Sequence, residues 1–184
     1  METRTETEKT ERQIMPKDLL EHYIEARANG YASGKKAAEF WFQEASKFKR
    51  YKFHGDTPYY YQDYYYDREE RPGNFGGFEI NSEYAYDGEK LTFYVYGGGL
   101  TNEGLALGEE AVYSRLQKFL AEHIPNVRFG KKNKFEFEDG AGIWVYEGDG
   151  EIGDWGWNDK ERIIYNGQVV YELVGTGLCF TKGF

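Results

Sequence analysis

The chain has 184 residues, of which 34 are aromatic (17 Tyr, 13 Phe and 4 Trp), and its formal net charge is −9. This length is typical of one domain or two small ones. So many rings can build a hydrophobic core, which excludes a chain that is disordered throughout. The acidic balance argues against nucleic acid as a main partner, because binding phosphate requires clustered lysine and arginine.

The cysteine count and the hydropathy of the chain further narrow the class of protein. Cys179 is the only cysteine, so the chain can form no disulfide framework and no cysteine-based zinc site. The run Leu178–Phe180 around it is typical of a buried strand. No stretch approaches the ~18–20 consecutive apolar residues of a transmembrane helix. Residues 1–15 are mostly polar and predict a disordered tail rather than a signal peptide. We therefore expect a cytoplasmic protein with no membrane association, no cofactor and no bound metal.

The first half begins with a predicted helix and continues with strands. Pro16 precedes apolar residues at helical spacing, and Gly30 provides a stop signal, which predicts a helix over 17–29. The aromatic segment 37–48 fits a short helix or an edge strand. From Tyr51 the pattern changes to a period of two, rich in tyrosine. The strands expected from this pattern are 59–66, 75–84 and 91–96.

Turn signals separate these strands. Arg71–Asn74 predicts a turn between the first two, and Asp87–Gly88 predicts a two-residue type I′ hairpin before the third. We expect the run Gly97–Gly99 to end the strand that precedes it.

The second half repeats this order. Thr101 or Asn102 can cap a helix whose apolar stripe extends to Ile124, and Pro125 ends it. Asp139–Gly140, Asn166–Gly167 and Gly175–Gly177 then supply turns or strand ends. The strands predicted here are 134–138, 143–147, 152–158, 161–165, 168–174 and 178–181.

Laid over each other, the halves match in order at an offset of roughly 77–84 residues, as expected of an internal repeat. The predicted fold is α+β: two tandem repeats of a helix plus about four antiparallel strands, packed as one pseudo-symmetric domain. The expected boundaries are a tail at 1–15, a first repeat at 16–100 and a second repeat at 101–184.

Several short motifs lie in patches from about Leu20 to Glu172. They are His22–Ala32, Tyr61–Tyr65, Gly77–Glu79, Leu91–Gly97, Glu161–Gly167 and Val170–Glu172. These segments resemble an uncharacterised family of bacterial and archaeal domains of unknown function, so the resemblance implies no established activity. Members occur alone or behind an XRE-type helix-turn-helix domain, which suggests ligand sensing by analogy only.

The most specific polar signal is a pair of strand carboxylates. Residues two apart on a strand share a face, so Asp63 and Glu79 would lie together among tyrosines if their strands pair, with Gly77 leaving room beside them. In the second half Glu79 aligns with Gly156, so we expect the full pair in the first repeat only. The predicted ligand-binding residues are Tyr61, Asp63, Tyr65, Glu79, Tyr94 and Tyr96.

Several functions fit this pattern. The first is a non-enzymatic binding or regulatory module for a small molecule or peptide, with a polyhydroxy or cationic ligand held by rings and acids. The second is a glycoside-type hydrolase using Asp63 and Glu79, although no nucleophile, metal or orienting partner accompanies them. The third is a structural, self-associating protein. The acids can also simply face solvent, and we expect structural roles for His22, His54 and His123.

Overall fold

The computed structural model describes residues 15–30, 38–42, 46–67, 73–85, 87–123 and 127–181. Within these residues the chain is α+β, with three helices and one antiparallel sheet of nine strands. The elements are α1 Lys17–Asn29, β1 Ala38–Phe42, β2 Ser46–Phe53, β3 Tyr59–Asp67, β4 Asn74–Glu83, β5 Lys90–Leu100, α2 Asn102–Leu107, α3 Glu109–His123, β6 Asn133–Asp139, β7 Gly142–Ile152, β8 Gly156–Tyr165 and β9 Gln168–Cys179.

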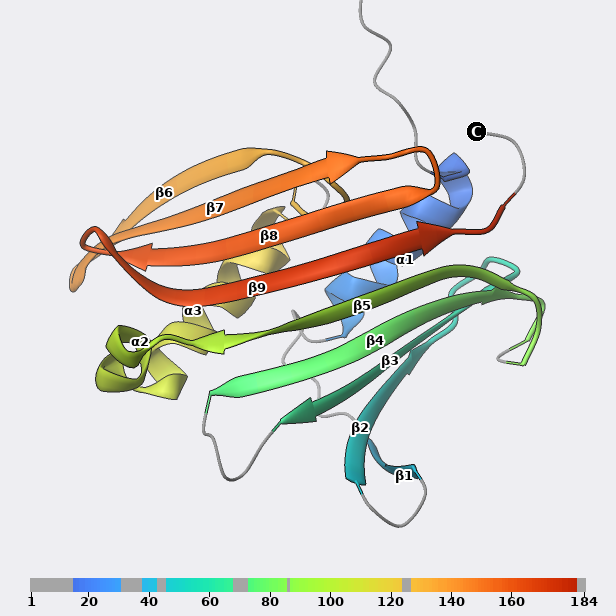
Figure 1. Cartoon of the computed structure of the whole chain (residues 1–184), viewed down its shortest axis with the longest axis horizontal. Helices are drawn as coiled ribbons and strands as arrows, with labels where there is room; N and C mark the ends of the chain where they lie inside the picture. The colour runs from blue at the N-terminus through green and yellow to red at the C-terminus, as the bar shows by residue number, and fades with distance from the viewer. Residues whose placement is uncertain are drawn as a thin grey trace, which may run out of the picture.

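The sheet consists of two meanders that meet in its middle. Its strand order is β1-β2-β3-β4-β5-β9-β8-β7-β6, so the last strand of each half pairs with the other. Helices α1 and α3 lie on the same face of this sheet (Figure 1). One core cluster lies around α1 and includes Leu19 and Tyr23, and a second lies around α3 and includes Leu116 and Phe119. The helices thus bury one face of the sheet, as an antiparallel sheet requires.

The helices follow the sequence pattern closely. The predicted helix at 17–29 is confirmed, with Pro16 at the N-cap position directly before it. The single helix predicted for the second half is instead two, because Gly108 (φ +96°) interrupts it between α2 and α3. The Thr101 hydroxyl accepts a hydrogen bond from the Gly104 N–H, which confirms the predicted cap. Ile124, Pro125 and most of the predicted tail lie outside the described residues.

Two turn predictions have opposite outcomes. Asn166 and Gly167 both have positive φ (46° and 82°), which confirms the hairpin turn between β8 and β9. The two-residue turn at Asp87–Gly88 is wrong. The β4–β5 connection spans residues 84–89, Tyr84 takes the positive φ (62°), and the Gly88 N–H donates to the Ala85 carbonyl. The ambiguous segment 37–48 contains β1 and the start of β2, so its described part is strand rather than helix.

The glycine runs do not end their strands, which corrects the sequence prediction. Gly97–Gly99 lies within β5, and Gly175–Gly177 lies within β9. In β5 the neighbouring backbone is close, because a Cβ at Gly98 would overlap the Glu172 carbonyl oxygen of β9. In β9 the reason is the size of the neighbouring rings: a Cβ at Gly175 would overlap Tyr94, and one at Gly177 would overlap Trp157. Glycine here lets a ring lie flat against the next strand. The predicted break between 158 and 161 is likewise absent, because β8 is continuous.

Replacing Gly177 by alanine tests this explanation. The added methyl group would enter the space of the buried Trp157 ring, so we expect a loss of about 1–3 kcal/mol in the free energy of unfolding. Gly140→Ala is the control, because a Cβ there meets nothing within 4 Å. Urea denaturation measures both variants. Equal stability of the two would contradict the packing argument.

Candidate functional site

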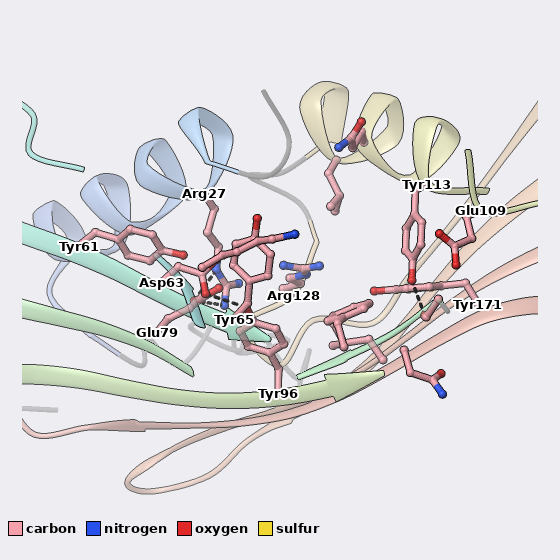
Figure 2. Close-up of a pocket in the computed structure, with 17 residues that line it drawn as sticks. Arg27, Tyr61, Asp63, Tyr65, Glu79, Tyr96, Glu109, Tyr113, Arg128 and Tyr171 are labelled. Carbon is pink, nitrogen blue, oxygen red and sulfur yellow. Dashed lines mark hydrogen bonds and ion pairs between the residues drawn. The ribbon is translucent and has the colours of Figure 1, made fainter. Parts of the chain in front are cut away.

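A cavity of about 330 Å³ lies between the helices and the sheet. Its walls come from α1, four strands of the first half, α3, β9 and the segment that follows α3, and Figure 2 shows their side chains converging on one space. Six of the residues that line it are aromatic: Tyr61, Tyr65, Phe75, Tyr96, Tyr113 and Tyr171. Another six are charged: Arg27, Lys49, Asp63, Glu79, Glu109 and Arg128.

The structure places five of the six predicted site residues on this cavity: Tyr61, Asp63, Tyr65, Glu79 and Tyr96. The sixth, Tyr94, does not line it. Its fully buried ring stacks on Trp157, with 5.8 Å between the ring centroids and an angle of 8° between the ring planes. Tyr94 is therefore part of the core beside the cavity.

Asp63 and Glu79 lie directly opposite each other on β3 and β4. This is the cross-strand pair that the period of two predicts, and both side chains are buried (8% and 4% exposed). The Tyr96 hydroxyl donates a hydrogen bond to Oδ1 of Asp63 over 2.7 Å. Burial and then the nearby charge of Glu79 raise the pKa of Asp63 to about 7. At neutral pH, Asp63 thus exchanges between a hydrogen-bond donor and an anion.

Glu79 is held by α1. The Arg27 guanidinium donates to Oε2 of Glu79 from Nη2 (2.6 Å) and from Nε (2.9 Å), and the Tyr23 hydroxyl donates to the same oxygen. Arg27 itself lies against the rings of Tyr23, Tyr94 and Phe129, at 4.5–4.8 Å from their centroids. This arrangement fixes the carboxylate of Glu79 in an ion pair and attaches the end of α1 to the sheet.

A second buried ion pair comes from the other half of the chain. Arg128 follows α3 and donates to both carboxylate oxygens of Glu161 on β8, from Nε over 2.9 Å and from Nη2 over 3.0 Å. The hydroxyls of Tyr146 and Tyr171 donate to Glu161 as well. Burial opposes ionisation of Glu161, but Arg128 and these hydrogen bonds outweigh it and lower its pKa.

The sequence interpretation assigned no role to Arg128 or Glu161. The available signal was the buried period-two pattern of β8, in which Glu161 occupies a position that faces the core. Arg128 gave no signal of this kind, because it follows the helix in irregular backbone. Both Arg128 and Phe129 have positive φ (64° and 57°), an uncommon conformation for non-glycine residues. The structure holds this strained turn where it directs Arg128 toward Glu161.

The three histidines lie apart from the cavity. His22 is buried, its Nδ1 lies 2.9 Å from the Thr57 hydroxyl, and burial followed by the charge of His54 lowers its pKa to about 4. The rings of His54 and His123 contact Tyr60 and Phe119. Cys179 is buried in β9, as predicted. In the described part of the chain, no group of three or more His, Cys, Asp or Glu side chains could hold a metal ion.

Comparison of the chain with family models, with curated proteins and with solved structures gave no match. The family resemblance therefore stays a prediction. Among the helices that the structure describes, none is both long enough and apolar enough to cross a bilayer.

Replacing Asp63 by asparagine tests whether burial raises the pKa of the Asp63 carboxyl group. As pH rises above about 4, the unfolded chain releases the Asp63 proton while the folded protein keeps it, so the wild type loses stability until about pH 7. Asparagine has no such proton. We expect Asp63→Asn to unfold with a free energy up to about 4 kcal/mol higher at pH 8 and nearly unchanged at pH 4.

Thermal unfolding at the two pH values measures this difference. Asp56→Asn removes the same charge at an exposed turn position and serves as the control. If both variants behave alike at pH 8, Asp63 does not carry the proposed penalty.

Breaking the buried Arg128–Glu161 pair should be costly. Glu161→Gln leaves a guanidinium only 12% exposed without its counter-charge, and we expect a loss of about 3 kcal/mol in unfolding free energy. Glu172→Gln is the matched control on the neighbouring strand, because its partner Arg162 and its own side chain are 36% and 47% exposed. It should cost less than about 1 kcal/mol. Urea denaturation compares them, and similar losses would refute the difference.

Proposed function

We propose that this protein is a non-enzymatic module that binds a small polar molecule in the cavity between the helices and the sheet. The observation that carries the proposal is the concave space of about 330 Å³, lined by aromatic rings and by Asp63. Small-molecule sites are concave and largely apolar, with a few polar groups that orient the ligand. The volume lies at the small end of such sites, which favours a small molecule over a peptide.

The polar groups of the cavity suit a ligand with several hydrogen-bonding atoms. Asp63 can accept or donate a hydrogen bond near neutral pH. Tyr61 and Tyr96 add hydroxyl oxygens on the same side, and Figure 2 shows the Tyr61 hydroxyl directed toward Asp63. Stacking on the rings adds apolar contact at little cost in entropy. A regulatory role would agree with the sensing analogy, and it rests on that resemblance alone.

The glycoside hydrolase alternative has weaker support. A two-carboxylate mechanism needs one residue as an acid and the other as a nucleophile or base. Asp63 has the raised pKa of an acid, but Oε2 of Glu79 receives three hydrogen bonds, two of them from Arg27. An anion neutralised in this way is a poor nucleophile. No observation favours self-association over ligand binding.

We further propose that the two halves are copies of one unit. In each half an arginine at or after the helix pairs with a buried glutamate on the last strand but one: Arg27 with Glu79, and Arg128 with Glu161. This equivalence replaces the earlier alignment of Glu79 with Gly156. By strand register, Gly148 lies opposite Glu161 as Asp63 lies opposite Glu79. The extra carboxyl group then belongs to the first copy alone.

Filling the cavity tests the proposed binding function. Gln117 lines the cavity from α3, so Gln117→Trp should occupy part of it, whereas the next residue, Lys118, is exposed on the same helix. A fragment library is screened by ligand-observed NMR against the wild type. We expect its hits to bind Lys118→Trp unchanged and to lose about 10-fold or more in affinity for Gln117→Trp.

Thermal unfolding and far-UV circular dichroism confirm that both variants are folded. Hits that bind both variants equally would show that the ligand lies elsewhere. Absence of any hit on the wild type would contradict the proposed function itself.

A further inference from the structure

We infer that the ligand carries a positively charged amine, which pairs with Asp63. This inference rests on the proposed binding function and specifies the chemical class of the ligand. It depends on three features of the cavity: the pairing of its buried charges, the rings around Asp63 and the ionisation of that carboxyl group near neutral pH.

In the part of the chain that the structure describes, the buried charges that line the cavity are paired except at Asp63; Asp159, which is buried but does not line the cavity, accepts hydrogen bonds from the Gly130 N–H and from Nε1 of Trp157. Arg27 is neutralised by Glu79, and Arg128 is neutralised by Glu161. Among the described residues, Asp63 forms no ion pair of its own, and its hydrogen-bond partner is the uncharged Tyr96. An ionised Asp63 therefore adds one negative charge that the surrounding protein does not balance. A buried carboxylate of this kind needs a counter-ion, and a ligand amine can provide it.

The rings around Asp63 suit an ammonium group. Tyr61 and Tyr65 lie two residues on either side of Asp63 and so share its face of β3, and Tyr96 approaches from β5. Aromatic faces attract cations through the ring quadrupole. Because Tyr96 already donates its proton to Asp63, its oxygen can accept from the ligand. A primary ammonium has three donors, which the carboxylate and the tyrosine oxygens can satisfy.

Other charged groups near the cavity determine how strongly an ionised Asp63 attracts a cation. Glu79, Arg27 and Arg128 act on Asp63 through the interior. Lys49 and Glu109 line the cavity with opposite charges from β2 and α3, and Lys49 lies over the Tyr65 ring at 5.8 Å. Counted with Glu161, the partner of Arg128, these groups are three positive and three negative charges that cancel, so the protonation of Asp63 decides whether the whole set is anionic. The chain as a whole, at −9, also attracts cations rather than anions.

The charge of Asp63 gives the sign of the pH dependence. Its pKa of about 7 means that most molecules carry the anion at pH 8 and few carry it at pH 6. Alkyl amines remain protonated across this range. Amine binding should therefore strengthen roughly tenfold from pH 6 to pH 8, whereas binding of a neutral analogue should not.

Two sets of matched probes test the inference. One set is phenethylamine, 2-phenylethanol and phenylacetate, and the other is hexylamine, hexanol and hexanoate. Each set shares a skeleton and varies the charge from positive through neutral to negative. NMR titration at pH 8 gives the affinities. We expect an amine to bind about 10-fold or more tightly than its alcohol, and Asp63→Asn to abolish that preference while Asp56→Asn retains it.

The possible results distinguish a failure of this inference from a failure of the proposed binding function. Alcohols or carboxylates that bind as tightly as the amines, or amine binding that Asp63→Asn leaves unchanged, would overturn the inference. So would failure of all six probes when other library compounds occupy the cavity. If Asp63→Asn does not fold, the wild-type pH profile decides, because a flat profile for the amines contradicts pairing with Asp63. A cavity that binds no compound at all contradicts the proposed function instead.

Discussion

The structure depends on the burial of two guanidinium groups between the helices and the sheet. A buried cation is tolerated only when a counter-charge and hydrogen bonds replace its hydration. Arg27 therefore has to meet Glu79, and Arg128 has to meet Glu161. The first contact joins α1 to β4, and the second joins the turn after α3 to β8, so together they help to fix where the helices lie over the sheet. The cavity is the space that remains between these two fixed points.

Asp63 departs from this rule of paired charges. It lies beside Glu79 and forms no ion pair with any residue that the structure describes, and burial followed by the charge of Glu79 raises its pKa. A protein selected only for stability would gain from an uncharged side chain there, since the ionised form opposes folding above neutral pH. Stability is commonly given up where a site needs a reactive or charged group. This reasoning selects Asp63, rather than the fully paired Glu79, as the centre of the proposed site.

The sequence predicted the parts of the fold that local rules control. The helix at 17–29, the turn at Asn166–Gly167 and the facing of Asp63 and Glu79 all follow from periodicity and turn chemistry. Prediction failed where contacts with residues distant in the sequence determine the local structure. Gly175–Gly177 continues a strand because rings from neighbouring strands need the space. Arg128 becomes important only when its turn meets Glu161, 33 residues further along the chain, and no spacing rule indicates that contact.

The proposed repeat distinguishes residues that stabilise the fold from residues that would contact the proposed ligand. If Glu79 and Glu161 are equivalent, the arginine–glutamate pair belongs to both copies and serves the fold. Strand register then places Gly148 where the first copy has Asp63. A group needed for the architecture should occur twice, whereas a group needed for binding can be present once. Under this proposed equivalence Asp63 would occur in the first copy alone, and it lines the cavity beside Arg27 and Arg128. The asymmetry between the copies therefore supports a binding role for this carboxyl group independently of its charge.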